Sequence, residues 1–145
     1  MIETLRELES LLRKHGYNGQ ADAVRGVLVA IETDDRATLA REATGPSLWG
    51  GAGSVADVDL RYGSPRPPAE AAADVPRFHR AMVALADQLE SASLATRRTR
   101  NVASTFRRGW RRVSNEALQQ TSAQSIAVEW LDSEYSRQPT ARLDG

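Results

Sequence analysis

The chain has 145 residues, with 19 basic and 19 acidic side chains and no cysteine. This length fits one domain with an appendage, and the lack of cysteine excludes disulfides and thiolate metal sites. The opening MIETLRELES carries acids where a secretory signal needs a basic and then an apolar run, and no stretch has the ~18 continuous apolar residues of a membrane span. We therefore expect a cytoplasmic protein with no membrane span.

The composition predicts a modest hydrophobic core. Leucine, isoleucine, valine and phenylalanine account for only 29 residues, whereas alanine, which favours helices but buries little area, is abundant. We therefore expect thin, closely packed helices. The charges are unevenly distributed, because residues 76–115 hold nine arginines against two acids and both flanking segments are acidic. Only this basic block could select a partner through its net charge.

Two amphipathic helices are predicted at the start of the chain. Apolar residues recur three to four positions apart from Ile2 to Leu12 and again from Ala21 to Ile31, which indicates one apolar face on each helix. Gly16 suits the C-terminal cap of the first helix, and Asn18 is a candidate N-cap for the second. The short connection between them predicts an antiparallel hairpin.

A short helix is predicted next, capped by Asp35 and running through Leu39 to Glu42. The glycine-rich stretch SLWGGAGSVADVDLRYG, residues 47–63, follows it. The three prolines of SPRPPAE then exclude a helix, and we expect the next one to open at Asp74 and Pro76, because proline is tolerated in a first turn. The apolar stripe of that helix is regular and consists of Phe78, Met82, Leu85, Leu89 and Ala92.

The character of the chain changes at residue 97. The segment TRRTRNVASTFRRGWRRV contains seven arginines and no acid, and its apolar residues keep helical spacing. We therefore predict an all-α protein, a small helical bundle in two parts. Residues 1–96 form a helical domain that carries the glycine-rich loop at 47–63, and residues 97–145 form an arginine-rich helical extension, packed on that domain or partly mobile.

The sequence GGAGS resembles a phosphate-binding loop, because glycines let backbone N–H groups converge on an anion. Nucleotide-binding patterns also need a Lys-Ser/Thr pair or a preceding strand, and this segment has neither. Ser54 and Asp57 instead have the spacing of a capping box, which favours a structural turn that Trp49 pins to the hairpin. The alternative is a loop that also presents Asp57, Asp59 and Arg61 to a partner.

The segment WGGAGSVADVDL resembles the GG-x-GS-x-x-D loop of a family of small bacterial helical domains, and it is similar to Maf-type immunity proteins of polymorphic toxin systems. The resemblance covers about residues 5–94, and the chain departs from the pattern at Ala56 and in residues 97–145. The resemblance implies a protein that binds and neutralises a cognate toxin. The residues that match the pattern are Gly50, Gly51, Gly53, Ser54 and Asp57.

Catalysis has little support in the sequence. His15 lies at a predicted helix end, where a histidine favours the helix dipole, and His79 is expected at the surface. Neither histidine has further ligands at metal spacing. We therefore expect no enzyme, no cofactor and no metal.

The arginine block leaves three alternatives open. It could be a solvated helix that pairs with the acidic N-terminal half, a surface for an acidic protein, or a site for nucleic acid or a membrane. We predict a monomeric immunity protein that neutralises its toxin by stoichiometric binding. The alternative is a nucleic-acid-binding regulator that uses helix 97–112, although nucleic acid is the less favoured partner. The predicted partner-binding residues are Trp49, Asp57, Asp59, Arg61, Arg107, Trp110 and Arg111, with Gly50, Gly51, Gly53 and Ser54 as structural loop residues.

Overall fold

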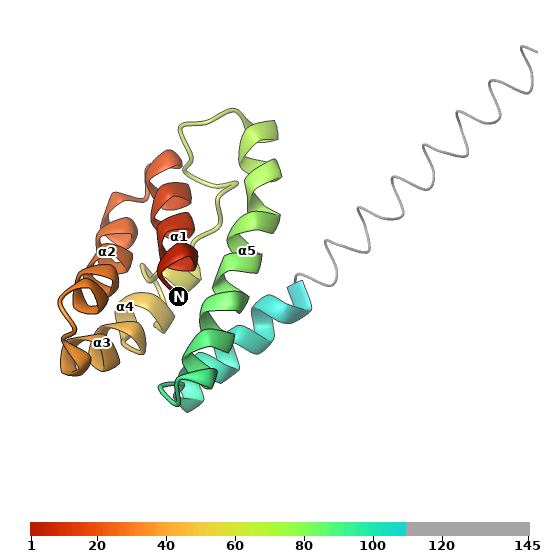
Figure 1. The fold of residues 1–145 in the computed structure, drawn as a ribbon. Coiled ribbons are helices and arrows are strands. Elements are labelled where there is room, and N and C mark those ends of the chain that lie inside the picture. Colours follow the sequence, from red (N-terminus) through yellow and green to blue (C-terminus); the bar gives the residue numbers. More distant parts are fainter. Residues whose placement is uncertain (110–145) are drawn as a thin grey trace, which may run out of the picture. The chain divides into compact units, whose positions relative to one another are not determined.

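The computed structural model describes residues 1–109, and these residues form an all-α bundle without a strand (Figure 1). Two helices, α1 (Ile2–Lys14) and α2 (Asn18–Glu32), form the predicted hairpin. Helix α3 (Arg36–Ala43) and the short α4 (Pro46–Trp49) follow, and the 3-10 turn η1 (Val55–Asp57) interrupts the loop that leads to α5 (Pro68–Ser91). No helix within the described part of the chain is long and apolar enough to cross a membrane.

The hairpin closes as its sequence predicts. Helix α1 ends at Lys14, and Gly16 adopts a positive φ of 81° while the Tyr17 N–H donates to the Leu12 carbonyl. This is the left-handed exit that glycine favours after a helix. Asn18 does not cap α2, because it is already the first helical residue and Tyr17 precedes it without a side-chain cap. The prediction for Asp35 is confirmed, since its carboxylate accepts from the Thr38 N–H at 3.0 Å.

Helix α5 begins earlier than the sequence predicts. It starts at Pro68 and carries Pro76 in its interior instead of in its first turn. Proline is tolerated at the first position, and the alanine-rich residues that follow Pro68 favour a helix. The helix continues past Pro76 with one backbone N–H fewer than other residues would supply. Four members of the predicted stripe are buried, but Ala92 is exposed at the C-cap.

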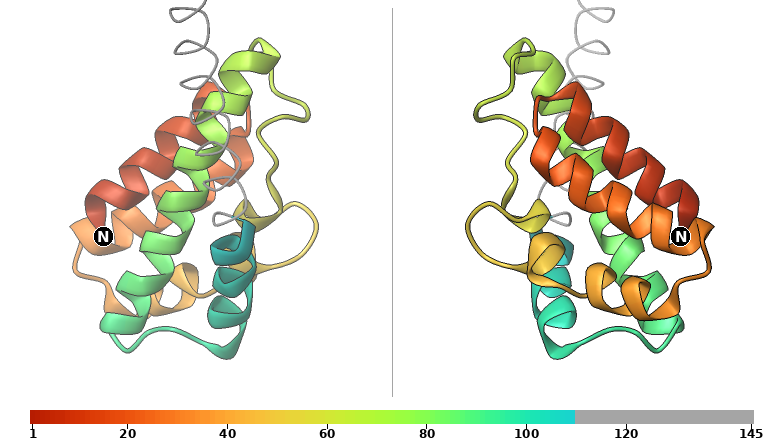
Figure 2. Two further views of the ribbon diagram at one scale, coloured as in Figure 1. Left: turned by 90° about the vertical axis from the view of Figure 1, so that its right-hand side faces the viewer. Right: turned by 90° about the vertical axis from the view of Figure 1, so that its left-hand side faces the viewer.

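The core lies where α1, α2 and α5 meet, with α4 and the loop closing one end (Figures 1 and 2). Residues 97–109 are helical and lie beside the C-terminal half of α5. Phe106 meets Phe78 edge to face at a centroid distance of 6.2 Å, a favourable geometry for aromatic rings. The described part of the predicted extension is therefore packed on residues 1–96. The rest of it, including Trp110 and Arg111, lies outside the described residues.

Candidate partner-binding surface

The loop between α4 and α5 begins at a tightly packed glycine. A Cβ at Gly50 would overlap the backbone oxygen of Pro46, whereas a Cβ at Gly51 would meet nothing within 4 Å. Trp49, just before it, is 1% exposed, and its indole N–H donates to the Ala43 carbonyl at 2.7 Å. Trp49 therefore holds the start of the loop, but its hydrogen bond goes to the end of α3 and not to the predicted hairpin. Its prediction as a partner contact is wrong, because the indole is enclosed in the core.

Ser54 and Asp57 do not form the predicted capping box, because Asp57 accepts from the Gly53 N–H and not from that of Ser54. The Asp57 carboxylate accepts from the Gly53 N–H at 3.1 Å, and Gly53 has a positive φ of 84°. The Ser54 hydroxyl does not cap η1 and donates backward to the Gly50 carbonyl at 3.1 Å. The box fails because η1 has only three residues, so the serine finds its partner on the preceding turn. Both side chains nevertheless hold the glycine turn together.

Helix α2 fixes the loop from one side. The Tyr17 hydroxyl lies 2.8 Å from the Asp59 carbonyl and also contacts the Tyr62 carbonyl. The Gln20 amide donates to the Gly53 carbonyl at 3.0 Å. These contacts join residues far apart in the sequence, and sequence periodicity carries no signal for them.

An ion pair and an exposed aromatic ring lie at the outer part of this loop. The Arg61 guanidinium donates to Asp59 at 2.9 Å, and this hydrogen bond lowers the pKa of the Asp59 carboxyl. The same guanidinium lies over the Tyr62 ring, 5.7 Å from its centroid, within cation–π range. Tyr62 is 72% exposed. Tyr62 is not among the residues predicted to bind a partner, although its place beside Arg61 in a glycine-bounded loop is a signal.

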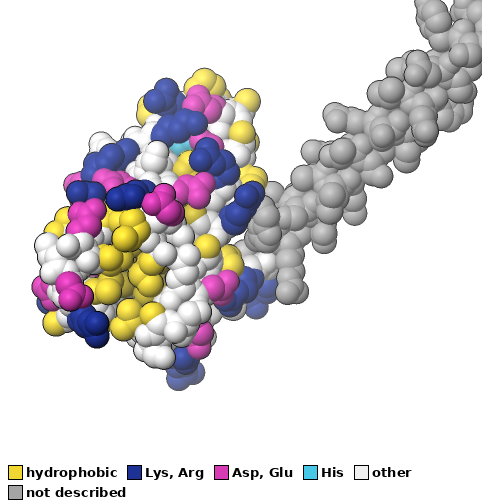
Figure 3. Space-filling view, viewed as in Figure 1, with side chains coloured by type: hydrophobic (Ala, Val, Ile, Leu, Met, Phe, Trp, Pro, Cys, Tyr) yellow, Lys and Arg dark blue, Asp and Glu magenta, His cyan; other side chains and the backbone are white. Residues whose placement is uncertain are grey.

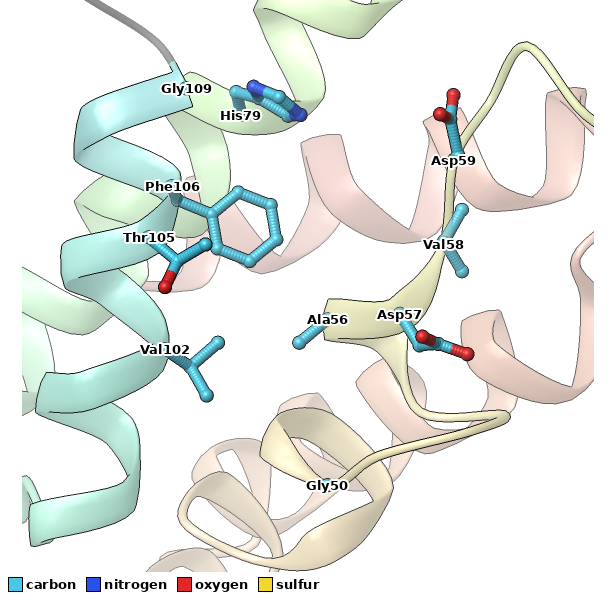
Figure 4. A pocket seen from close by; sticks show the side chains of 10 residues that line it. All are labelled: Gly50, Ala56, Asp57, Val58, Asp59, His79, Val102, Thr105, Phe106 and Gly109. Carbon is cyan, nitrogen blue, oxygen red and sulfur yellow. The ribbon is translucent and has the colours of Figure 1, made fainter.

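Two hollows flank residues 56–59. The first, about 370 Å³, lies between this segment and helix 97–109, and we call it the apolar hollow (Figure 4). Ala56 points toward Val102 of the helix across it, whereas Asp57 points away from the helix. Its full lining is Gly50, Ala56, Asp57, Val58, Asp59, His79, Val102, Thr105, Phe106 and Gly109.

His79 lines the apolar hollow and is partly buried, so its prediction as a surface residue is only partly correct. The ring is half-buried and meets Phe106 edge to face at 5.2 Å. Its Nδ1 atom is buried and has no hydrogen-bond partner among residues 1–109. Burial lowers the pKa of His79, while the nearby Asp59 charge raises it and that of Arg61 lowers it. The neutral ring is therefore the favoured form at neutral pH.

The second hollow, about 300 Å³, lies on the α2 side of the same segment, and we call it the tyrosine hollow. Aromatic, amide and carboxylate side chains surround it, and Asp57 and Asp59 line both hollows. The lining residues are Tyr17, Gln20, Gly53, Ser54, Asp57, Val58, Asp59 and Tyr62. Asp57 and Asp59 thus line both hollows, Tyr62 lines the tyrosine hollow, and Arg61 pairs with Asp59 beside them.

Two of the five arginines in helix 97–109 pair with acids on α5. Arg100 pairs with Glu90 at 2.8 Å, and Arg107 pairs with Asp87. Arg107 was predicted to contact a partner, but its guanidinium already forms an ion pair with the Asp87 carboxylate. The hypothesis of a paired, solvated helix is therefore correct for these two residues, with α5 in place of the N-terminal half.

A buried polar cluster joins the end of α1 to α5. His15 is fully buried, with Nε2 at 3.0 Å from Asp74 and Nδ1 at 2.8 Å from the Ser64 hydroxyl. Serine, histidine and carboxylate are the components of a nucleophilic triad. Here, however, no substrate could reach the enclosed imidazole, and Lys14 holds the same Asp74 oxygen at 2.6 Å. Neither hollow includes Ser64, so we assign the cluster to stability.

The described residues contain no group of three or more His, Cys, Asp or Glu side chains arranged to hold a metal ion. The chain matches no family model, and no curated protein or solved structure is significantly similar to it.

Proposed function

We propose that the protein binds another protein through the loop of residues 50–66, and that this partner is a bacterial toxin domain which it neutralises stoichiometrically. The observation that carries the proposal is the exposed Tyr62, stacked with Arg61 on a loop that Tyr17 and Gln20 hold in place. Tyrosine and arginine are enriched among the residues that dominate binding energy at protein interfaces. The toxin as partner is the expectation from the loop resemblance.

Nucleic acid is the weaker candidate partner. Two arginines of helix 97–109 are already paired with acids of α5. Basic and acidic side chains are also interleaved on the visible face of the described residues, and they do not segregate into a basic stripe (Figure 3). A phosphate-binding surface is typically a cluster of unpaired lysines and arginines on one face. A mixed-charge face fits a protein partner better.

The test measures binding of the full chain to the toxin domain encoded beside its gene, by titration calorimetry. We expect a one-to-one complex, and Tyr62→Ala should weaken it by about 2 kcal/mol, or ~30-fold, as loss of an interface hot spot does. Val29→Ala is the matched control, because Val29 is also an exposed apolar residue, at 43%, but lies on α2 away from the loop. Equal affinities for the two variants would show that the loop is not the interface.

Salt dependence separates the two candidate partners. Binding to DNA or RNA would weaken steeply with salt, because counterions are released for each phosphate neutralised. We expect no retardation of either nucleic acid at physiological salt. Specific, salt-sensitive retardation that is lost when Arg97 and Arg98 are replaced by alanine would instead support the regulator hypothesis.

A further inference from the structure

The tyrosine hollow combines an aromatic wall with a carboxylate. Tyr17 and Tyr62 line it together with Asp57, and Gln20 closes one side. Tyr17 is held by its hydroxyl, and Gln20 by its amide, so both keep their positions in the free protein. Tyr62 is mostly exposed, which leaves much of its ring area open to a second molecule.

The charge of this hollow is not balanced. Asp59 is neutralised by Arg61, which donates to both of its oxygens. Asp57 is exposed and has no cationic side chain within ion-pair distance among residues 1–109. One Asp57 oxygen accepts the Gly53 N–H, but a carboxylate offers about four acceptor sites. The hollow therefore presents one uncompensated negative charge and free acceptors beside two tyrosine rings.

We infer that the tyrosine hollow receives an arginine side chain of the partner protein. A guanidinium is planar, stacks on tyrosine and donates in a fork that suits a carboxylate. A lysine would satisfy the charge but would stack less well, and an aliphatic side chain would leave Asp57 without a cation. The inference deepens the proposed function, because it gives the chemistry of one partner residue.

The experiment uses a small probe and no toxin. The full chain, labelled with ¹⁵N, is titrated with the peptide acetyl-Gly-Arg-Gly-amide and, separately, with the same peptide carrying citrulline, the neutral isostere of arginine. We expect saturable shifts at the amides of Gly53, Asp57 and Tyr62, and an affinity at least ~10-fold higher for the arginine peptide. Equal affinities, or shifts confined to other parts of the protein, would overturn the inference.

Two matched variants sharpen the test. Asp57→Asn removes the charge but keeps an oxygen that can accept the Gly53 N–H, and it should abolish the preference for arginine over citrulline. Asp34→Asn makes the same chemical change at a side chain that is 90% exposed and outside both hollows, so it should leave the preference intact. A preference that survives in Asp57→Asn would also overturn the inference.

The outcome separates this inference from the proposed function. If the arginine peptide binds the hollow but no toxin domain binds the chain, the proposed function fails and the inference stands. If a toxin domain binds in a Tyr62-dependent manner but the peptides show no arginine preference, the inference alone fails.

Discussion

At the scale of single residues, Asp74 shows how a buried charge can depend on its neighbours. Its side chain is only 7% exposed, yet it contacts Lys14, His15 and Arg77. Burial by itself would raise the pKa of this carboxyl. Hydrogen bonds from Lys14 and His15, with the charges of Lys14 and Arg77, outweigh burial and lower the pKa from 3.8 to about 2.

This lowered pKa predicts acid sensitivity. A carboxyl whose pKa is lower in the folded state contributes its full stabilisation when the pH is above its pKa in the unfolded state. That stabilisation is lost as the pH falls through its pKa in the folded state. Asp74 should therefore contribute about 2 kcal/mol that disappears between roughly pH 4 and pH 2. Urea denaturation of the wild type and of Asp74→Asn at pH 6 and pH 2 measures it. The variant should lose less stability over this range, and equal losses would contradict the assignment.

The short elements around the loop depend on backbone contacts more than on side-chain pattern. Helix α4 has only four residues, and Gly50 ends it with its backbone against Pro46. This close contact between the two backbone segments requires glycine at position 50, because any Cβ there would overlap the Pro46 backbone, which cannot move aside. Gly51, the next residue, has open space around its Cα.

The two adjacent glycines therefore predict different responses to the same change. Gly50→Ala should lower the free energy of unfolding by about 2 kcal/mol, because the added methyl group forces the backbone of α4 to shift. Gly51→Ala should change it by no more than about 0.5 kcal/mol, as expected for an exposed and unhindered position. Chemical denaturation of both variants compares them directly. A larger loss for Gly51→Ala would refute this description of the turn.

At the scale of the whole described body, helix 97–109 is part of the core. Phe106 is 8% exposed and packs on Phe78 and His79. We expect Phe106→Ala to lower the free energy of unfolding by about 3 kcal/mol, as large-to-small changes in a core do. Thr105→Ala, at the exposed neighbouring position, should cost no more than about 0.5 kcal/mol. A Phe106→Ala variant as stable as this control would mean that the helix does not pack on α5.

The helices with a regular apolar stripe were predictable from sequence, because burial of one face places apolar residues three to four positions apart. This spacing remains recognisable even where single residues depart from it. The start of α5 was not, since Pro76 suggested a boundary that the preceding alanines override. The burial of Trp49 was not predictable either, because the four residues of α4 are too few to show a helical period of apolar residues. The loop residues Asp57, Asp59 and Arg61 were identified, but the hollows depend on Tyr17, Tyr62 and His79, which only the folded chain brings together.

Hydrogen bonds from the Tyr17 hydroxyl and the Gln20 amide to backbone carbonyls shape the loop before any second molecule arrives. A segment that is already in its bound conformation gives up little conformational entropy on association. The favourable contacts of a few exposed side chains then have only a small entropy cost to offset. A small contact area can therefore support a tight complex. The Tyr17 hydroxyl would thus influence affinity by holding the loop in place, apart from any contact that the Tyr17 ring makes with a bound molecule.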